Sequence, residues 1–78
     1  MTQRLQIDMN GEKMRELDDL MRESGVATKK EFVNSALTLL KWAINQRRAG
    51  RIIASIDEKT DSYRELEMPI LSVIKPLE

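Results

Sequence analysis

The sequence predicts a mainly α-helical fold that begins with one short β-strand and is completed by a second copy of the chain. Three observations support this prediction. Polar and apolar side chains alternate over residues 4–10, two helical patterns follow almost at once, and the first segment therefore lacks a neighbouring strand. Because backbone N–H and C=O groups are almost never buried without a hydrogen bond, we expect this strand to pair antiparallel with its equivalent about a two-fold axis. The expected product is a homodimer with a two-stranded ribbon.

The alternation in residues 4–10 is typical of a half-buried strand, whose successive side chains point to opposite faces. The apolar face would consist of Leu5, Ile7 and Met9, and the polar face of Arg4, Gln6, Asp8 and Asn10. We expect the apolar face to lie on the helical core and the polar face to be exposed.

The first helix is predicted from Glu12 to about Ser24, with Asn10 as its N-cap and Gly25 as its left-handed C-terminal residue. Its apolar positions have helical spacing and indicate core packing: Met14, Leu17, Leu20 and Met21.

The second helix is predicted from Lys29 to about Arg48, because Thr28 and Glu31 have capping-box spacing and Gly50 is a plausible stop. Its apolar positions extend over more than one face, which favours a dimer interface: Phe32, Val33, Ala36, Leu37, Leu39, Leu40, Trp42, Ala43 and Ile44. Trp42 suits the core or the dimer contact, and the alternative is an exposed anchor for another protein.

A different pattern follows Gly50. Residues 51–56 and 63–68 have the composition of two strands around a polar turn, and Pro69 would restrict the second to a sheet edge. We therefore predict a C-terminal hairpin with an extended tail. The chain would consist of a dimerisation domain, 1–50, and a C-terminal segment, 51–78, of uncertain role.

Composition excludes several classes of function. The chain has no cysteine and no histidine, so disulfides, thiolate metal sites and nucleophile–histidine catalysis are ruled out. There is no Gly-rich phosphate loop, no apolar run long enough for a membrane span and no signal peptide. We expect a cytoplasmic protein that is not an enzyme and has no metal or other cofactor.

The formal net charge is zero, but the charges are unevenly distributed. Residues 1–51 hold ten Lys or Arg and seven Asp or Glu, whereas residues 52–78 hold three and six. The excess of basic side chains in residues 1–51 permits phosphate binding.

Two features could contact double-stranded DNA. The exposed strand face could place Arg4 on guanine and Gln6 on adenine in the major groove, although an ordinary polar face would have the same pattern. The start of the second helix offers free N–H groups beside Lys29 and Lys30, which suit phosphate. Capping alone would also explain Thr28 and Glu31.

The order of these motifs resembles the ribbon-helix-helix (MetJ/Arc-type) repressor superfamily over about residues 2–48. The resemblance is carried by the R-L-x-I-x-M pattern from Arg4, the turn at Ser24-Gly25-Val26 and the run from Thr28 to Val33 ahead of Ala36-Leu37. It implies an intertwined homodimer in which residues 1–50 are the DNA-binding and dimerisation domain. It also implies base contacts by Arg4, Gln6 and Asp8, and a phosphate clamp formed by the backbone at Thr28 and Lys29, helped by Lys30. Asp8 departs from the family pattern, and the loop at residues 26–28 is one residue longer than in many relatives.

The leading prediction of function is a sequence-specific DNA-binding repressor that inserts a dimeric β-ribbon into the major groove. The alternative is an antitoxin or protein-interaction module with weak or no DNA binding. Its C-terminal segment, residues 51–78, would bind a toxin or another protein by strand addition. In a third reading, the hairpin only covers the dimer core.

Overall fold

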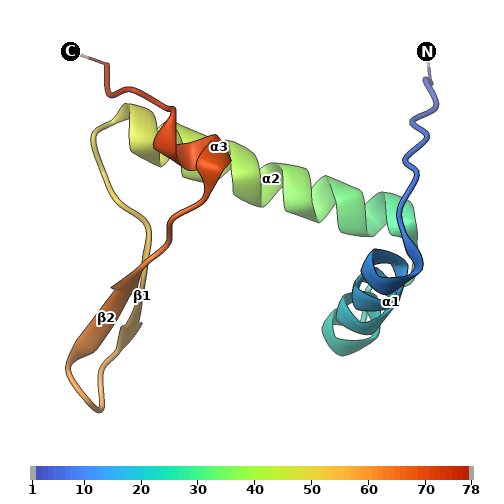
Figure 1. Ribbon diagram of the computed structural model, residues 1–78, viewed down its shortest axis with the longest axis horizontal. Coiled ribbons are helices and arrows are strands. Elements are labelled where there is room, and N and C mark those ends of the chain that lie inside the picture. The colour runs from blue at the N-terminus through green and yellow to red at the C-terminus, as the bar shows by residue number, and fades with distance from the viewer. Residues whose placement is uncertain (1, 78) are drawn as a thin grey trace. The chain divides into compact units, whose positions relative to one another are not determined.

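The computed structural model describes residues 2–77, in which helices precede a small antiparallel sheet (Figure 1). The elements in chain order are α1 (Gly11–Ser24), α2 (Lys29–Arg48), β1 (Ala54–Asp57), β2 (Ser62–Glu65) and α3 (Pro69–Ser72). The chain divides into two compact units, Met1–Asn34 and Ser35–Glu78, which are described separately below.

Helix α1 has the caps that the sequence predicts. Asn10 is extended, and its side-chain Oδ1 accepts a 2.8 Å hydrogen bond from the N–H of Lys13. At the other end Gly25 is left-handed, with φ of 73°, and the N–H of Val26 donates to the carbonyl of Met21 at 3.1 Å. These bonds satisfy N–H and C=O groups that have no hydrogen-bond partner within the helix. The predicted bounds of the helix are confirmed within one residue.

Helix α2 also begins and ends where predicted. The Oγ1 atom of Thr28 accepts a 3.1 Å hydrogen bond from the N–H of Glu31, as an N-cap residue should. At the C-terminal end Gly50 has φ of 82°, and the N–H of Arg51 donates to the carbonyl of Gln46 at 3.0 Å. Only glycine adopts such a φ without steric cost, which explains why the helix stops there.

The C-terminal hairpin is present, although its strands are shorter than predicted. β1 and β2 pair antiparallel, with Ile56 opposite Tyr63. The turn is stabilised by a 3.0 Å bond from the N–H of Lys59 to Asp57 Oδ1, and Asp61 has a positive φ of 55°. Asp tolerates this conformation better than most residues, so the polar cluster of the sequence forms the turn.

The predicted extended tail is wrong at residues 69–72, which form helix α3. Pro69 stands at the start of this helix, where its missing N–H costs nothing, and the N–H of Ser72 donates to the carbonyl of Met68 at 2.9 Å. Farther on, the N–H of Leu77 donates to the carbonyl of Arg48 at 2.7 Å, so the tail returns to the end of α2. Proline therefore starts a helical turn here instead of restricting a strand to a sheet edge.

The predicted strand-first architecture is wrong. Residues 2–10 form neither strand nor helix, and the sheet follows the two long helices instead of preceding them. A strand needs a partner for its N–H and C=O groups, and the described chain pairs its strands locally across the turn at residues 58–61. Closing so short a loop costs little entropy, whereas residues 2–10 have no comparable neighbour. The ribbon-helix-helix arrangement is therefore not the fold of this chain.

Burial is sparse throughout the described residues. Ala43 and Leu71 are the buried apolar residues, and fifteen large apolar side chains are exposed. None of the described helices is both long and apolar enough to cross a membrane.

Replacing Gly25 with alanine should lower the free energy of unfolding by about 1 kcal/mol, because an L-residue resists the left-handed conformation. A Cβ atom at this position would meet nothing within 4 Å, so the loss would come from the backbone alone. The measurement is urea unfolding at one fixed protein concentration.

Gly11→Ala is the matched control, since Gly11 lies in α1 without a positive φ and also has open space around its Cβ position. It should leave stability unchanged or raise it slightly. Equal losses from both variants would contradict the capping role of Gly25.

Candidate nucleic-acid interface

The three side chains predicted to contact bases lie on the N-terminal segment. Arg4, Gln6 and Asp8 are all exposed, and within residues 2–77 none of them makes a hydrogen bond or ion pair. Arg4 offers the fork of donors that suits guanine or phosphate, and Gln6 offers a donor and an acceptor. Asp8 only accepts hydrogen bonds at neutral pH, so on DNA it would suit an amino group and repel phosphate.

The predicted phosphate contacts lie at the start of α2, in the same unit. Thr28 uses its side chain and its carbonyl to accept the N–H groups of Glu31 and Phe32, at 3.1 Å each. The first two N–H groups of the helix, from Lys29 and Lys30, have no acceptor among the described residues. Both lysine side chains are exposed beside this positive end of the helix dipole.

The structure does not join these two groups into one site by direct contact. Arg4 and the α2 start both belong to the unit Met1–Asn34, but within the described chain no hydrogen bond or ion pair links them. Each group is therefore a separate exposed feature of that unit.

Helix α1 adds little positive charge to the unit. Two of its three cations form ion pairs on the helix surface, Lys13 with Glu16 at 3.1 Å and Arg22 with Asp19 at 3.0 Å. Exposed pairs of this kind contribute little to stability, but they neutralise charge that could otherwise attract phosphate.

A cationic stretch on α2 was missed by the sequence prediction. Residues 32–56 contain four Lys or Arg and neither Asp nor Glu. Lys41 and Arg48 are exposed and lie seven residues apart, which places them on nearly the same side of a helix with 3.6 residues per turn. The absence of acidic residues is visible in the sequence, but the common face becomes clear only when the helix is known.

The other two cations of this stretch close the helix end. Arg47 donates from Nη1 to the carbonyl of Arg51 at 3.4 Å, and Arg51 donates from Nη1 to Gln46 Oε1 at 3.2 Å. Positive charge at a helix C-terminus also stabilises the dipole. Arg47 and Arg51 are therefore structural, and Lys41 and Arg48 are the cations left for a ligand.

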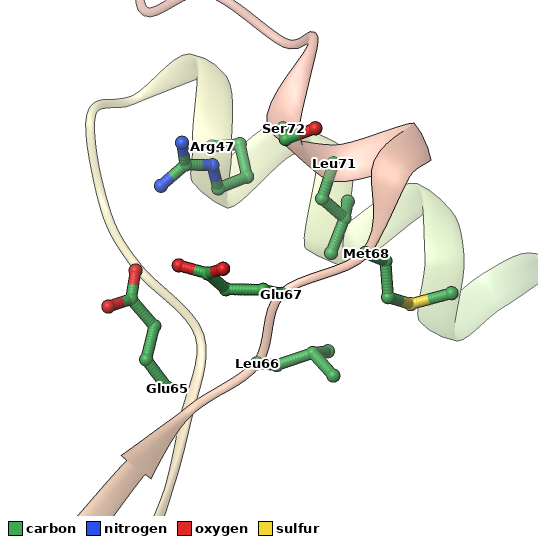
Figure 2. Close-up of a pocket in the computed structure, with 7 residues that line it drawn as sticks. All are labelled: Arg47, Glu65, Leu66, Glu67, Met68, Leu71 and Ser72. Carbon is green, nitrogen blue, oxygen red and sulfur yellow. The ribbon is translucent and has the colours of Figure 1, made fainter.

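A small open cavity lies in the second unit, Ser35–Glu78 (Figure 2). Its volume is about 110 Å³, and its walls are formed by Arg47, Glu65, Leu66, Glu67, Met68, Leu71 and Ser72. The carboxylates of Glu65 and Glu67 and the guanidinium of Arg47 lie on the same side of it (Figure 2). No nucleophile with a neighbouring base is present in this lining, and in residues 2–77 no group of three acidic side chains is placed to hold a metal ion.

Comparison of the chain with protein-family models, curated proteins and solved structures finds no match.

Thr28→Ala should lower the free energy of unfolding by about 1 kcal/mol, because the N–H of Glu31 loses its side-chain acceptor. Thr28→Ser keeps the hydroxyl and should retain most of the stability. Urea unfolding of the three proteins measures the difference, and equal losses in both variants would show that the methyl group matters instead of the cap.

Proposed function

We propose that this protein is a DNA-binding transcriptional regulator, a repressor, that acts as a homodimer on double-stranded DNA. The observation that carries the proposal is the start of α2, where two N–H groups without an acceptor lie beside the exposed Lys29 and Lys30. Helix N-termini with this combination of donors and charge bind phosphate. The proposed location is the cytoplasm, with the DNA that the protein regulates.

Phosphate contacts would supply most of the affinity. Lys29 and Lys30 act with the N–H groups at the start of α2, and Lys41 and Arg48 are further exposed cations of that helix. Each neutralised phosphate releases counterions, so binding weakens as the salt concentration rises. In a homodimer each phosphate contact occurs twice, while the net charge stays zero.

Base contacts would supply the sequence preference. Arg4 and Gln6 lie on the exposed N-terminal segment, and their donors and acceptors match guanine and adenine edges in the major groove. Asp8 would accept a hydrogen bond from the amino group of cytosine. These contacts are proposed for a flanking segment and not for a paired ribbon, since the strand-first arrangement is absent from the chain.

A second copy is proposed because the described residues bury little apolar surface. Ala43 and Leu71 are the buried apolar residues, whereas fifteen large apolar side chains are exposed. Small domains often gain the missing buried area by association with a second copy.

A second function is favoured by the apolar surface of the C-terminal unit. Ile70, Val73 and Leu77 are exposed close to the chain end, where they could bind a toxin or another protein. In this alternative the chain is an antitoxin or interaction module, and its DNA binding is weak or absent.

Arg4→Ala should relax sequence preference, whereas Lys29→Ala should weaken binding to all sequences alike and reduce the salt dependence. Arg4 is assigned to a base and Lys29 to phosphate, so the first variant should lose specificity and the second should lose affinity. Selection of bound sequences from a random DNA pool, followed by titrations at several salt concentrations, measures both effects.

Lys59→Ala is the matched control for charge, because Lys59 lies in the hairpin turn and is not assigned to either proposed contact. It should leave DNA binding unchanged. A loss as large as that of Lys29→Ala would mean that only net charge matters. Failure to enrich any sequence from the pool would reject sequence-specific recognition.

The midpoint of thermal unfolding should rise with protein concentration, because folding and association of an obligate dimer are one equilibrium. Over a hundredfold range of protein concentration the midpoint should rise by about 4 °C or more for a small domain. Differential scanning calorimetry at several concentrations measures this rise. A constant midpoint together with a monomeric mass in sedimentation would exclude the homodimer.

A further inference from the structure

The C-terminal end of α2 is completed by a residue that is distant in the sequence. The turn around Gly50 supplies N–H donors to the carbonyls of Gln46 and Arg47, at 3.0 Å each. This is the usual pairing after a left-handed glycine, and it leaves later carbonyls of the helix open. The carbonyl of Arg48 accepts its hydrogen bond from the N–H of Leu77 instead, at 2.7 Å. The last residue of α2 is therefore held by a segment outside the helix.

We call this segment, residues 66–77, the C-terminal strap. A backbone hydrogen bond joins each of its ends to the preceding chain: the N–H of Leu66 donates to the carbonyl of Ile53, and that of Leu77 to Arg48, at 2.7 Å each. Between these two bonds, α3 lies beside the C-terminal part of α2 within the same unit (Figure 1). The strap therefore covers the end of α2 and is fixed at both of its own ends.

Leu71 is the side chain on which closure of the strap depends most. It is 3% exposed, whereas its neighbours Ile70 and Val73 are 46% and 72% exposed. Leu71 lines the same cavity as Arg47 of α2 (Figure 2). Within residues 2–77, no ion pair and no side-chain hydrogen bond joins the strap to α2. Because polar side-chain contacts are absent there, burial of this leucine is needed to keep the strap closed.

The strap also packs beside the glycine that ends α2. A Cβ atom added at Gly50 would lie 3.9 Å from the Cβ of Pro76, which is an ordinary van der Waals distance. Pro76 directly precedes Leu77, so this contact lies next to the hydrogen bond to Arg48.

We propose that the C-terminal strap holds the last turn of α2, and with it Arg48, in position for phosphate binding. This role rests on the proposed DNA contact of Arg48. Leu71 and the N–H of Leu77 would be positioning groups, because neither of them touches the phosphate.

Arg48 needs such support more than the other free cation of the helix. Its side chain is exposed and makes no hydrogen bond or ion pair within the described residues, and it belongs to the last helical residue. The last turn of a helix frays readily, and a side chain on a frayed turn must be ordered when its ligand binds. Lys41 lies inside α2, where helical hydrogen bonds on both sides hold the backbone. The strap should therefore matter for Arg48 and not for Lys41.

The first test removes one N–H group. Leu77→Pro deletes the donor to the carbonyl of Arg48, whereas the control Leu77→Ala keeps the donor and shortens a side chain that is 78% exposed. Without DNA, Leu77→Pro should speed hydrogen exchange of the Gly50 and Arg51 amides by at least about threefold, because the last turn of α2 opens more often. Leu77→Ala should leave these rates unchanged. Equal rates in the two variants, measured by NMR on the full chain, would overturn the proposal.

The second test measures whether the strap acts through Arg48. Titrations with duplex DNA at several salt concentrations should show weaker binding of Leu77→Pro and a salt slope lower by up to about 1 for each chain. Leu77→Ala should bind like the unaltered chain. Adding Arg48→Ala to Leu77→Pro should cause no loss beyond that of Arg48→Ala alone, whereas the effect of Lys41→Ala should add to that of Leu77→Pro. Full additivity with Arg48→Ala would overturn the proposal.

A second pair of variants tests the anchor of the strap. Leu71→Ala and the control Ile70→Ala each shorten an apolar side chain of α3, but only Leu71 is buried. Leu71→Ala should reproduce the faster amide exchange and the weaker DNA binding of Leu77→Pro, and Ile70→Ala should not. Equal effects of the two variants would overturn the anchoring role of Leu71.

Failure of this proposal is distinguishable from failure of the proposed function. If the unaltered chain binds no DNA even at low salt, the regulator proposal and the phosphate contact of Arg48 both fail. Amide exchange, which needs no DNA, then still decides whether the strap holds the end of α2. If DNA is bound but Leu77→Pro and Leu77→Ala bind it equally well, the positioning role fails and the regulator proposal stands.

Discussion

Burial of apolar side chains is the constraint on which the rest of this structure depends. A chain of 78 residues is near the size at which one core becomes marginal, and here only Ala43 and Leu71 are buried among the described apolar residues. Hydrophobic burial is the main favourable term in folding. The described chain therefore holds its secondary structure largely through local hydrogen bonds.

Local hydrogen bonds explain why the helices were predictable. Asn10, Thr28, Gly25 and Gly50 each act on backbone groups within a few residues, so their sequence positions determine the helix ends. The hairpin was predictable for the same reason, because the polar turn that closes it lies between its two strands. Pro69 was read wrongly because proline suits both a sheet edge and the first turn of a helix.

Local hydrogen bonds could not decide whether residues 4–10 form a strand, because a strand can pair with a segment that is distant in the sequence. Alternation of side chains describes the two faces of a segment but does not identify its partner. Arg4, Gln6 and Asp8 are exposed as expected, although not on a strand, and the start of α2 is capped as expected. Lys41 and Arg48 were missed because each is an ordinary helix residue. Only the spacing along α2 and the lack of acidic neighbours make them a common surface.

The sides of α2 differ in what they offer to a ligand. Ala43 is buried, and Leu39 and Trp42 lie exposed on the same broad side of the helix, since Leu39 stands four residues before Ala43. Lys41 and Arg48 are exposed on the side roughly opposite to Leu39. Phosphate bound by these two cations would therefore leave the apolar side of the helix unoccupied. The proposed contact with DNA thus makes no use of Leu39 and Trp42.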